Sequence, residues 1–445
     1  MADETLHRAI GGRMLVIFIV GDILGAGIYA LVGKLAGFVG GAVWLPLAIG
    51  FALAALTACS YAELVGKYPR AAGAALYTHR AWGRPFFTFI VAFAVMMSGV
   101  ASAATAAVAF GGDYLQQLVD VPWWIAAFGF LALVTVINFI GISESIKVNF
   151  VLTMIELGGL LIVLIVGVVG IARGGGDIGR ALEIETPSGL LFGVAGATAL
   201  GFYALLGFED SVNLAEETEE PHRTFPRALF IGIALTGLLY VAIAIVAIAM
   251  MAPAQLAASK APLLDVVVAS GANFPPGVFA LIALFAICNT ALINLIMASR
   301  LLYGMANEKI VPSVFARVHP TRKTPYVAIL FSVAIAACLI LVGKDVGVLA
   351  STCTFLLLLV FGIVNVAVLV LRRRPVEHPH FHAPTWAPAL GAIGTVALAT
   401  PLADRDWKIY ALGGGLIALG AVLWVVQRLV GGKREGELDV ENLIK

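Results

Sequence analysis

Four carboxylic acids lie inside long apolar segments of this 445-residue sequence: Asp22, Glu156, Glu209 and Asp210. An ionised carboxylate in the hydrocarbon core of a membrane is costly, so acids at such positions usually carry protons or bind cations. Asp22 lies roughly 12 Å into its segment if that segment is helical, and Glu156 lies at a similar depth. No lysine or arginine occurs at these depths to pair with them. A protonated, hydrogen-bonded acid with a purely structural role is the alternative.

Glycines that could interrupt a helix lie beside two of these acids. Gly25 and Gly27 follow Asp22, and Gly207 precedes Glu209. Glycine leaves helical geometry at little cost. A break in the first segment would free three amides at the start of the next helix, those of Ala26, Gly27 and Ile28. The alternative is that these glycines only allow helices to pack closely in a membrane.

Breaks at these two positions predict a binding site for a zwitterion. Freed amides at a helix N-terminus, together with the helix dipole, suit a carboxylate. Freed carbonyl groups suit an ammonium group, and the residues that would supply them are Asp22, Ile23, Tyr203 and Leu206. Interrupted helices at matching positions of two halves of a chain are typical of transporters that bind their substrate near the membrane midplane.

The composition indicates that these residues lie within a membrane. Apolar residues make up 61% of the sequence and charged residues 12%, whereas soluble domains are about 45–50% apolar and about 25% charged. The mean hydropathy is +0.99. A net charge of +1 implies no nucleic-acid partner, and the four cysteines lie in apolar runs without metal-ligand spacing. We therefore expect a lipid-embedded protein with no cofactor and no structural metal.

We predict an all-α membrane protein with twelve transmembrane helices, because a helix satisfies its own backbone hydrogen bonds in lipid. The expected spans are 14–36, 42–65, 86–110, 122–142, 148–171, 190–217, 228–251, 278–304, 326–343, 346–371, 386–403 and 408–430. With this count, one face carries 21 of the 28 lysines and arginines. Both termini are therefore expected in the cytoplasm and the protein in the cytoplasmic membrane.

The glycine breaks fall in the first and sixth of these spans, which divides the chain into two halves of five spans. The expected divisions are a cytoplasmic N-terminus at 1–13, a first repeat at 14–171, a second repeat with its preceding outer loop at 172–371, spans eleven and twelve at 372–430, and a cytoplasmic tail at 431–445.

Other polar residues allow two interpretations each. Glu63, Glu216 and Glu217 lie near cytoplasmic span ends and are expected to form structural ion pairs or gate contacts. Asn289, Asn294 and Ser299 could face a binding site or form hydrogen bonds between helices. His378, His380 and His382 have a metal-like spacing, but a polar anchor in a cytoplasmic loop is the favoured interpretation.

Four stretches, in this order, resemble the amino acid–polyamine–organocation (APC) superfamily over nearly the whole chain. They are Gly25-Ala26-Gly27-Ile28, the region 60–77 with Tyr68-Pro69-Arg70, the region 207–226 with Gly207-Phe208-Glu209, and the region 299–325 with Ser299-Arg300-Leu301. The resemblance implies a leucine-transporter-type fold, with a five-plus-five inverted repeat and two extra helices, that works by alternating access.

The resemblance also implies roles for three residues. Glu209 matches an acid involved in gating and coupling, and Tyr203 matches an aromatic gate. Glu156 departs from the family, because some proton-coupled members carry at this position a lysine that replaces a sodium ion. An acid here puts that form of coupling in doubt and leaves a titrating carboxyl group or a cation site as options.

The sequence thus predicts a secondary transporter of amino acids or amines, coupled to protons. Asp22, Glu156 and Glu209 are expected around one cavity, where three ionised carboxylates would repel each other. A substrate with a second amine would relieve that repulsion, so cationic substrates are favoured. An exchanger of neutral amino acids and a transport-dead nutrient sensor remain alternatives. An enzyme is not expected, because no nucleophile–base set or metal cluster occurs at one depth.

Overall fold

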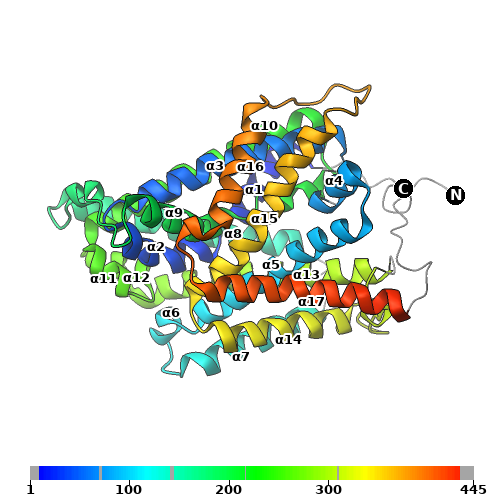
Figure 1. Cartoon of the computed structure of the whole chain (residues 1–445). Coiled ribbons are helices and arrows are strands. Elements are labelled where there is room, and N and C mark those ends of the chain that lie inside the picture. The colour runs from blue at the N-terminus through cyan, green and yellow to red at the C-terminus, as the bar shows by residue number, and fades with distance from the viewer. Residues whose placement is uncertain (1–9, 70–72, 141–144, 216, 308–309, 431–445) are drawn as a thin grey trace.

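The computed structural model describes residues 10–69, 73–140, 145–215, 217–307 and 310–430 (Figure 1). Within this part of the chain the structure is helical, without a β-strand, and two isolated bridges join short extended segments. Glu216, residues 1–9 of the expected N-terminal segment and the expected tail at 431–445 lie outside the described residues.

The helices follow one another along the chain and are joined by connections that range from a few residues to long segments with short helices of their own. The α-helices are α1 Gly12–Ile23, α2 Ala26–Val39, α3 Trp44–Lys67, α4 Gly73–Trp82, α5 Pro85–Phe110, α6 Asp113–Gln116, α7 Trp123–Ile140, α8 Ser145–Ala172, α9 Leu190–Gly201, α10 Pro221–Met250, α11 Pro253–Ala258, α12 Pro262–Ala269, α13 Pro276–Asn307, α14 Tyr326–Gly343, α15 Val346–Leu371, α16 Trp386–Ala399 and α17 Trp407–Val430. Five short 3-10 helices complete the set: η1 Ile178–Leu182, η2 Phe202–Leu205, η3 Asp210–Leu214, η4 Ser313–Ala316 and η5 Pro401–Ala403.

Local sequence signals fix several helix starts. Helices α5, α10, α11 and α12 begin with a proline, whose missing N–H is not needed in the first turn. Asp345 caps α15 by accepting hydrogen bonds from the amides of Gly347 and Val348. The same aspartate forms an ion pair with Lys34 of α2 at 3.1 Å.

The described chain contains ten helices long and apolar enough to cross a membrane, or eleven if the bent pair of α1 and α2 counts as one span. Helix α16 is apolar but has 14 residues, and it corresponds to the eleventh of the predicted spans. The multi-span helical architecture is therefore confirmed, and the count of twelve stays a prediction.

Both predicted helix interruptions are present. Helices α1 and α2 meet at an angle of 46°, with Leu24 and Gly25 in extended conformations between them. Helix α9 ends at Gly201 and continues as η2, after which Leu206 is extended. Gly207 then adopts φ +120° before η3 begins, a conformation that side chains rarely allow.

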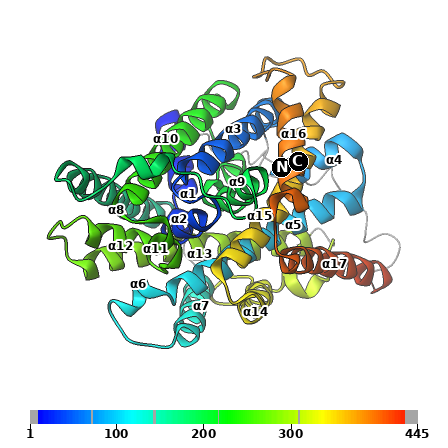
Figure 2. The ribbon, with the colours of Figure 1, turned by 60° about the vertical axis from the view of Figure 1, so that its left-hand side comes forward.

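One end of the bundle is covered by connecting segments. In Figures 1 and 2, α11 and α12 lie at the opposite end of the molecule from α4. The C-terminal part of α2 packs under this cover, because a side chain on Gly33 would overlap the carbonyl oxygen of Leu256. Trp44 Nε1 donates a hydrogen bond to the carbonyl oxygen of Ala181 in η1 at 2.8 Å. We call η1, α11 and α12 the cap.

Candidate functional site

A cavity of about 580 Å³ runs into the bundle from the end that carries α4. Its entrance is lined by His79 of α4 and by Arg300 and Asn307 near the end of α13. Its inner part is lined by the α1–α2 break, the segment after α9, and the facing sides of α5, α13 and α15. The cavity therefore joins the two predicted breaks to one end of the molecule.

The two breaks touch each other at the inner part of the cavity. A Cβ atom added to Gly207 would lie 2.5 Å from the carbonyl oxygen of Asp22. A Cβ atom added to Gly27 would lie 2.6 Å from the Cα atom of Ala204. Such distances leave no room for a side chain, so these glycines allow the backbones of α1–α2 and of the segment after α9 to meet.

The start of α2 presents amides that no helical carbonyl can satisfy. One of them is already used, because the amide of Ala26 donates to Thr290 Oγ1 of α13 at 3.0 Å. A Cβ atom on Gly25 would lie 2.9 Å from the same hydroxyl oxygen. Thr290 lines the cavity and was not singled out from the sequence, since an isolated threonine in an apolar helix carries no distinguishing pattern.

Two of the four carbonyl groups expected to face an ammonium group already have partners. The carbonyl oxygen of Ile23 accepts a hydrogen bond from the hydroxyl of Tyr240 at 3.1 Å. That of Tyr203 accepts from the amide of Leu206 at 3.4 Å. Asp22, Ile23, Tyr203 and Leu206 all line the cavity, as do Gly25, Ala26 and Gly27. Ile28 is buried and does not contribute to the lining.

Three acids line the cavity: Asp22, Glu209 and Asp210. Asp22 Oδ2 is buried without a hydrogen-bond partner among the described residues. Glu209 Oε2 accepts a hydrogen bond from the amide of Gly207 at 2.9 Å, which holds this carboxylate at the second break. The cavity therefore brings three carboxyl groups together.

Glu156 is not part of this cluster, contrary to the expectation that it shares the cavity with Asp22 and Glu209. It lies on α8, is 0% exposed, and is absent from the cavity lining. Neither of its carboxylate oxygens has a hydrogen-bond partner in the described chain. The hydroxyl of Tyr29 in α2 donates to its backbone oxygen at 3.0 Å. Asp210, from the same segment as Glu209, is the third acid of the cavity instead.

Tyr203 lies where the segment after α9 faces α5. Its hydroxyl is 3.0 Å from Ser102 Oγ, and the ring is 6% exposed. Both residues line the cavity. The contact joins the segment after α9 to α5 at the wall of the cavity, and the role of Tyr203 as a gate stays a prediction.

The three polar residues of α13 divide between the two interpretations. Asn294 lines the cavity and donates through Nδ2 to the carbonyl oxygen of Thr290 at 2.9 Å. Ser299 is buried and accepts from Asn138 Nδ2 of α7 at 3.4 Å, so it connects two helices. Asn289 is buried and is not part of the cavity lining.

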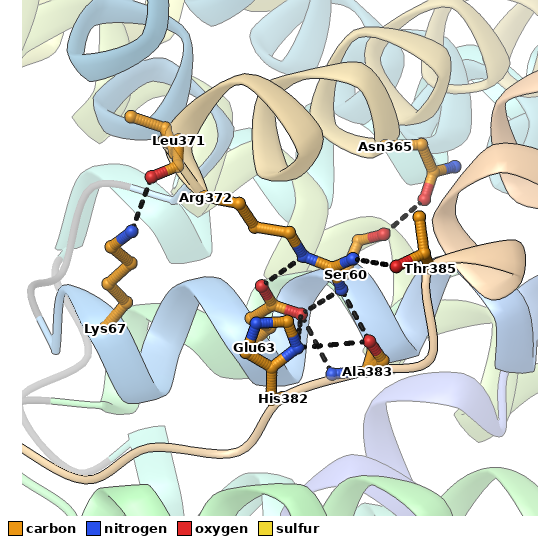
Figure 3. A network of polar contacts seen from close by, with 9 residues as sticks. All are labelled: Ser60, Glu63, Lys67, Asn365, Leu371, Arg372, His382, Ala383 and Thr385. Atoms are coloured by element: carbon orange, nitrogen blue, oxygen red, sulfur yellow. Dashed lines mark hydrogen bonds and ion pairs between the residues drawn. The ribbon is translucent and has the colours of Figure 1, made fainter. Parts of the chain in front are cut away.

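Glu63 forms an ion pair, as the sequence suggested, and anchors the segment between α15 and α16 to α3 (Figure 3). Its two carboxylate oxygens accept from Arg372 Nε and Nη2 at 2.8 Å and 2.6 Å. The amide of Ala383 donates to the same carboxylate at 2.9 Å, and His382 Nδ1 lies 3.8 Å away. Hydrogen bonding to Glu63 raises the pKa of Arg372.

More polar contacts extend this anchor along one face of α3. Lys67 Nζ donates to the carbonyl oxygen of Leu371 at 2.5 Å. One turn before Glu63, Ser60 donates to Asn365 Oδ1 at 2.6 Å, and Asn365 Nδ2 donates to Thr57 at 3.1 Å. A row of buried polar side chains thus fixes α3 to α15.

A membrane-embedded helical bundle with two interrupted helices in contact is typical of secondary transporters. A family model described as "Amino acid permease" matches residues 10–421. This chain therefore belongs to the amino acid permease family of the APC superfamily.

Curated relatives cover most of the chain at low identity. The branched-chain amino acid permease BcaP of Bacillus subtilis is 25% identical over 91% of this chain and 90% of its own length. The methylthioribose transporter of Bacillus subtilis is 26% identical over 95% and 92%. The cationic amino acid transporter 4 of Mus musculus is 26% identical over 85% of this chain and 62% of its own length. The relatives are thus permeases named for different substrates.

Proposed function

We propose that this permease is a secondary active transporter that carries an amino acid or a related amine across the cytoplasmic membrane by alternating access. The observation that carries the proposal is the contact between the two helix breaks at the inner part of the cavity. This contact brings the first amides of α2 and three acids around one volume. A zwitterion needs both kinds of group, and a helix N-terminus with a nearby acid supplies them.

The proposed orientation follows from the positions of these groups. The substrate carboxylate lies at the start of α2, near Ala26 and Gly27, with the amide of Ile28 one residue further into the helix. The α-ammonium group lies near Asp22, whose Oδ2 has no hydrogen-bond partner among the described residues. The carbonyl group of Leu206 supplies a further acceptor at the second break.

We favour cationic substrates, because Glu209 and Asp210 add two more acids to the cavity that holds Asp22. A neutral amino acid needs one of them at most. The cationic amino acid transporters among the relatives are consistent with this preference. Transport of neutral amino acids is the second candidate, favoured by the apolar lining at Met96 and Leu357 and by the similarity to a branched-chain permease.

Competition for binding to the purified protein separates these candidates. Lysine, arginine and putrescine are compared with leucine and alanine against labelled arginine and, separately, labelled leucine. For the cationic preference, the first three compete at least about tenfold better, which corresponds to about 1.4 kcal/mol. Asp22→Asn should weaken the binding of every amino acid tested. The control Glu220→Gln, at an exposed acid outside the cavity, should leave the affinities unchanged. The neutral transporter would be favoured if leucine binds best and if Asp22→Asn and Glu209→Gln leave the order of the ligands unchanged.

We further propose that protons drive uptake and that Glu156 carries the coupling proton, with Glu209 and Tyr203 acting in gating. Glu156 is buried beside α2 and outside the cavity, so its protonation does not compete directly with the substrate. In proteoliposomes, an inward proton gradient should stimulate uptake, and Glu156→Gln should abolish the stimulation but retain binding. Strict sodium dependence without an effect of the pH gradient would refute this coupling. Binding without any transport would indicate a nutrient sensor.

The proposal includes the arrangement in the membrane: twelve spans, a five-plus-five inverted repeat at 14–171 and 172–371, two further spans at 372–430, and cytoplasmic termini. The cavity then opens to the cytoplasm and the cap faces outward. Single cysteines at Arg374 and Asp404, in a background without the four native cysteines, test this orientation. An impermeant thiol reagent should label position 404 from outside in intact cells and position 374 only after lysis, and the reverse pattern would exclude it.

A further inference from the structure

Thr290 contacts the place where the proposed function puts the substrate carboxylate. Its Oγ1 accepts a hydrogen bond from the amide of Ala26 at 3.0 Å and donates to the carbonyl oxygen of Ala286 at 3.2 Å. Thr290 belongs to α13, whereas Ala26 begins α2. This hydrogen bond therefore joins two helices that are 264 residues apart in the chain.

The position of this hydroxyl is fixed by its surroundings. A Cβ atom on Gly25 would come within 2.9 Å of Thr290 Oγ1, so only glycine lets the threonine approach the end of α2 this closely. The bond to Ala286 is the i−4 contact that a threonine makes in one of its two helical rotamers. Asn294 holds the carbonyl oxygen of Thr290 from one turn further along.

We infer that Thr290 is a positioning residue that holds the Ala26 amide and gives it up to the substrate carboxylate. The carboxylate is the stronger acceptor, because a charged acceptor forms a hydrogen bond about twice as strong as a neutral one. Binding then breaks the direct hydrogen bond between α2 and α13 and replaces it with a contact to the substrate. The substrate thereby frees α2 to move relative to α13.

This role rests on the proposed function and predicts which ligands compete with Thr290. A ligand with a carboxylate competes with Thr290, whereas the same ligand without its carboxylate does not. Arginine and agmatine form one such pair, and leucine and 3-methylbutylamine form another. The pairs share a side chain and an amine, so the carboxylate is the main difference.

The test compares Thr290→Val with the wild type in binding assays on purified, monodisperse protein. Valine keeps the shape of threonine and lacks the hydroxyl. The variant should bind the preferred amino acid about two- to tenfold more tightly, the effect of removing one competing hydrogen bond. The affinity for the decarboxylated amine should not change. Thr290→Ser keeps the hydroxyl, so its affinities should stay close to those of the wild type. If Thr290→Val does not fold, Thr290→Ala is used in its place.

Two results would overturn the inference. Equal weakening of the amino acid and the amine in Thr290→Val would show that the hydroxyl only supports the structure. Unchanged affinity for the amino acid would show that the carboxylate does not displace the threonine. A wild-type protein that binds neither arginine nor leucine, nor any other amino acid, would instead refute the proposed function.

Discussion

Replacement of Gly207 by alanine tests the contact between the two helix breaks most directly. Gly207 has φ +120°, and a non-glycine residue in such a region costs about 1–3 kcal/mol. The new Cβ atom would also lie 2.5 Å from the carbonyl oxygen of Asp22, so one backbone has to move by roughly 1 Å at a cost of about 1–3 kcal/mol. We expect a total destabilisation of about 2–6 kcal/mol and loss of substrate binding.

The assay is thermal unfolding of the purified protein in detergent, combined with binding of labelled substrate. Gly414→Ala is the matched control, because Gly414 lies in helix α17 and a Cβ atom added to it would meet nothing within 4 Å in the described part of the chain beyond the adjacent backbone of its own helix. This control should be neutral or slightly stabilising. A Gly207→Ala variant with wild-type melting temperature and affinity would show that the two breaks do not need to touch.

Three further predictions concern Glu63 of the α3 anchor and two residues of the cavity lining, Tyr203 and His79. Glu63→Gln should destabilise the protein by about 3 kcal/mol, because Glu63 is 1% and Arg372 15% exposed and the arginine loses its charged partner; thermal unfolding measures this. Tyr203→Ala should raise the exchange rate of bound substrate, because the contact with Ser102 is lost, whereas Tyr203→Phe should have a smaller effect; dissociation of labelled substrate measures both. Burial lowers the pKa of His79 below its usual 6.5, so the unfolded chain takes up this proton first and stability should fall as the pH decreases below about 6.5. His79→Gln should make the loss of melting temperature between pH 7 and pH 5 smaller.

Controls separate these effects from general damage. Glu220→Gln removes one member of an exposed ion pair with Arg223 and should change the melting temperature little. His79→Gln should match the wild type at pH 8, where histidine is neutral in both states. Unchanged stability in Glu63→Gln, unchanged dissociation in Tyr203→Ala, or an unchanged pH profile in His79→Gln would each contradict the corresponding argument.

The sequence was sufficient to predict most of the apolar helices and both breaks, because both depend on local properties. A run of about 20 apolar residues is visible without any knowledge of its neighbours. The interruption at Gly25 and Gly207 depends on glycine within such a run, and both interruptions occur in the structure. The Glu63 ion pair was also predictable, since its location at the end of a span demands a basic neighbour.

The rotation of each helix about its own axis, which decides the side chains that face the cavity, could not be predicted in the same way. Glu156 and Asp22 lie at similar depth in their spans, yet only Asp22 faces the cavity. Helices that are apolar on all sides carry little information about rotation around their axes. Thr290 and Tyr240 meet the α1–α2 break from α13 and α10, and such long-range contacts depend on that rotation. Asp210 was recognised as a buried acid, but its place in the cavity required the path of the chain after Gly207.

The cap over α2 forms a surface that a binding protein such as an antibody fragment can recognise. Gly33, Gly41 and Trp44 hold the end of α2 and the turn after it against α11 and η1 by close backbone contacts, so the site cannot open at this end while the contacts last. The cap combines η1 and α11, which lie about 75 residues apart in the sequence. It is therefore a conformational epitope of the closed arrangement. An antibody fragment that binds across both segments should arrest turnover without competing with the substrate.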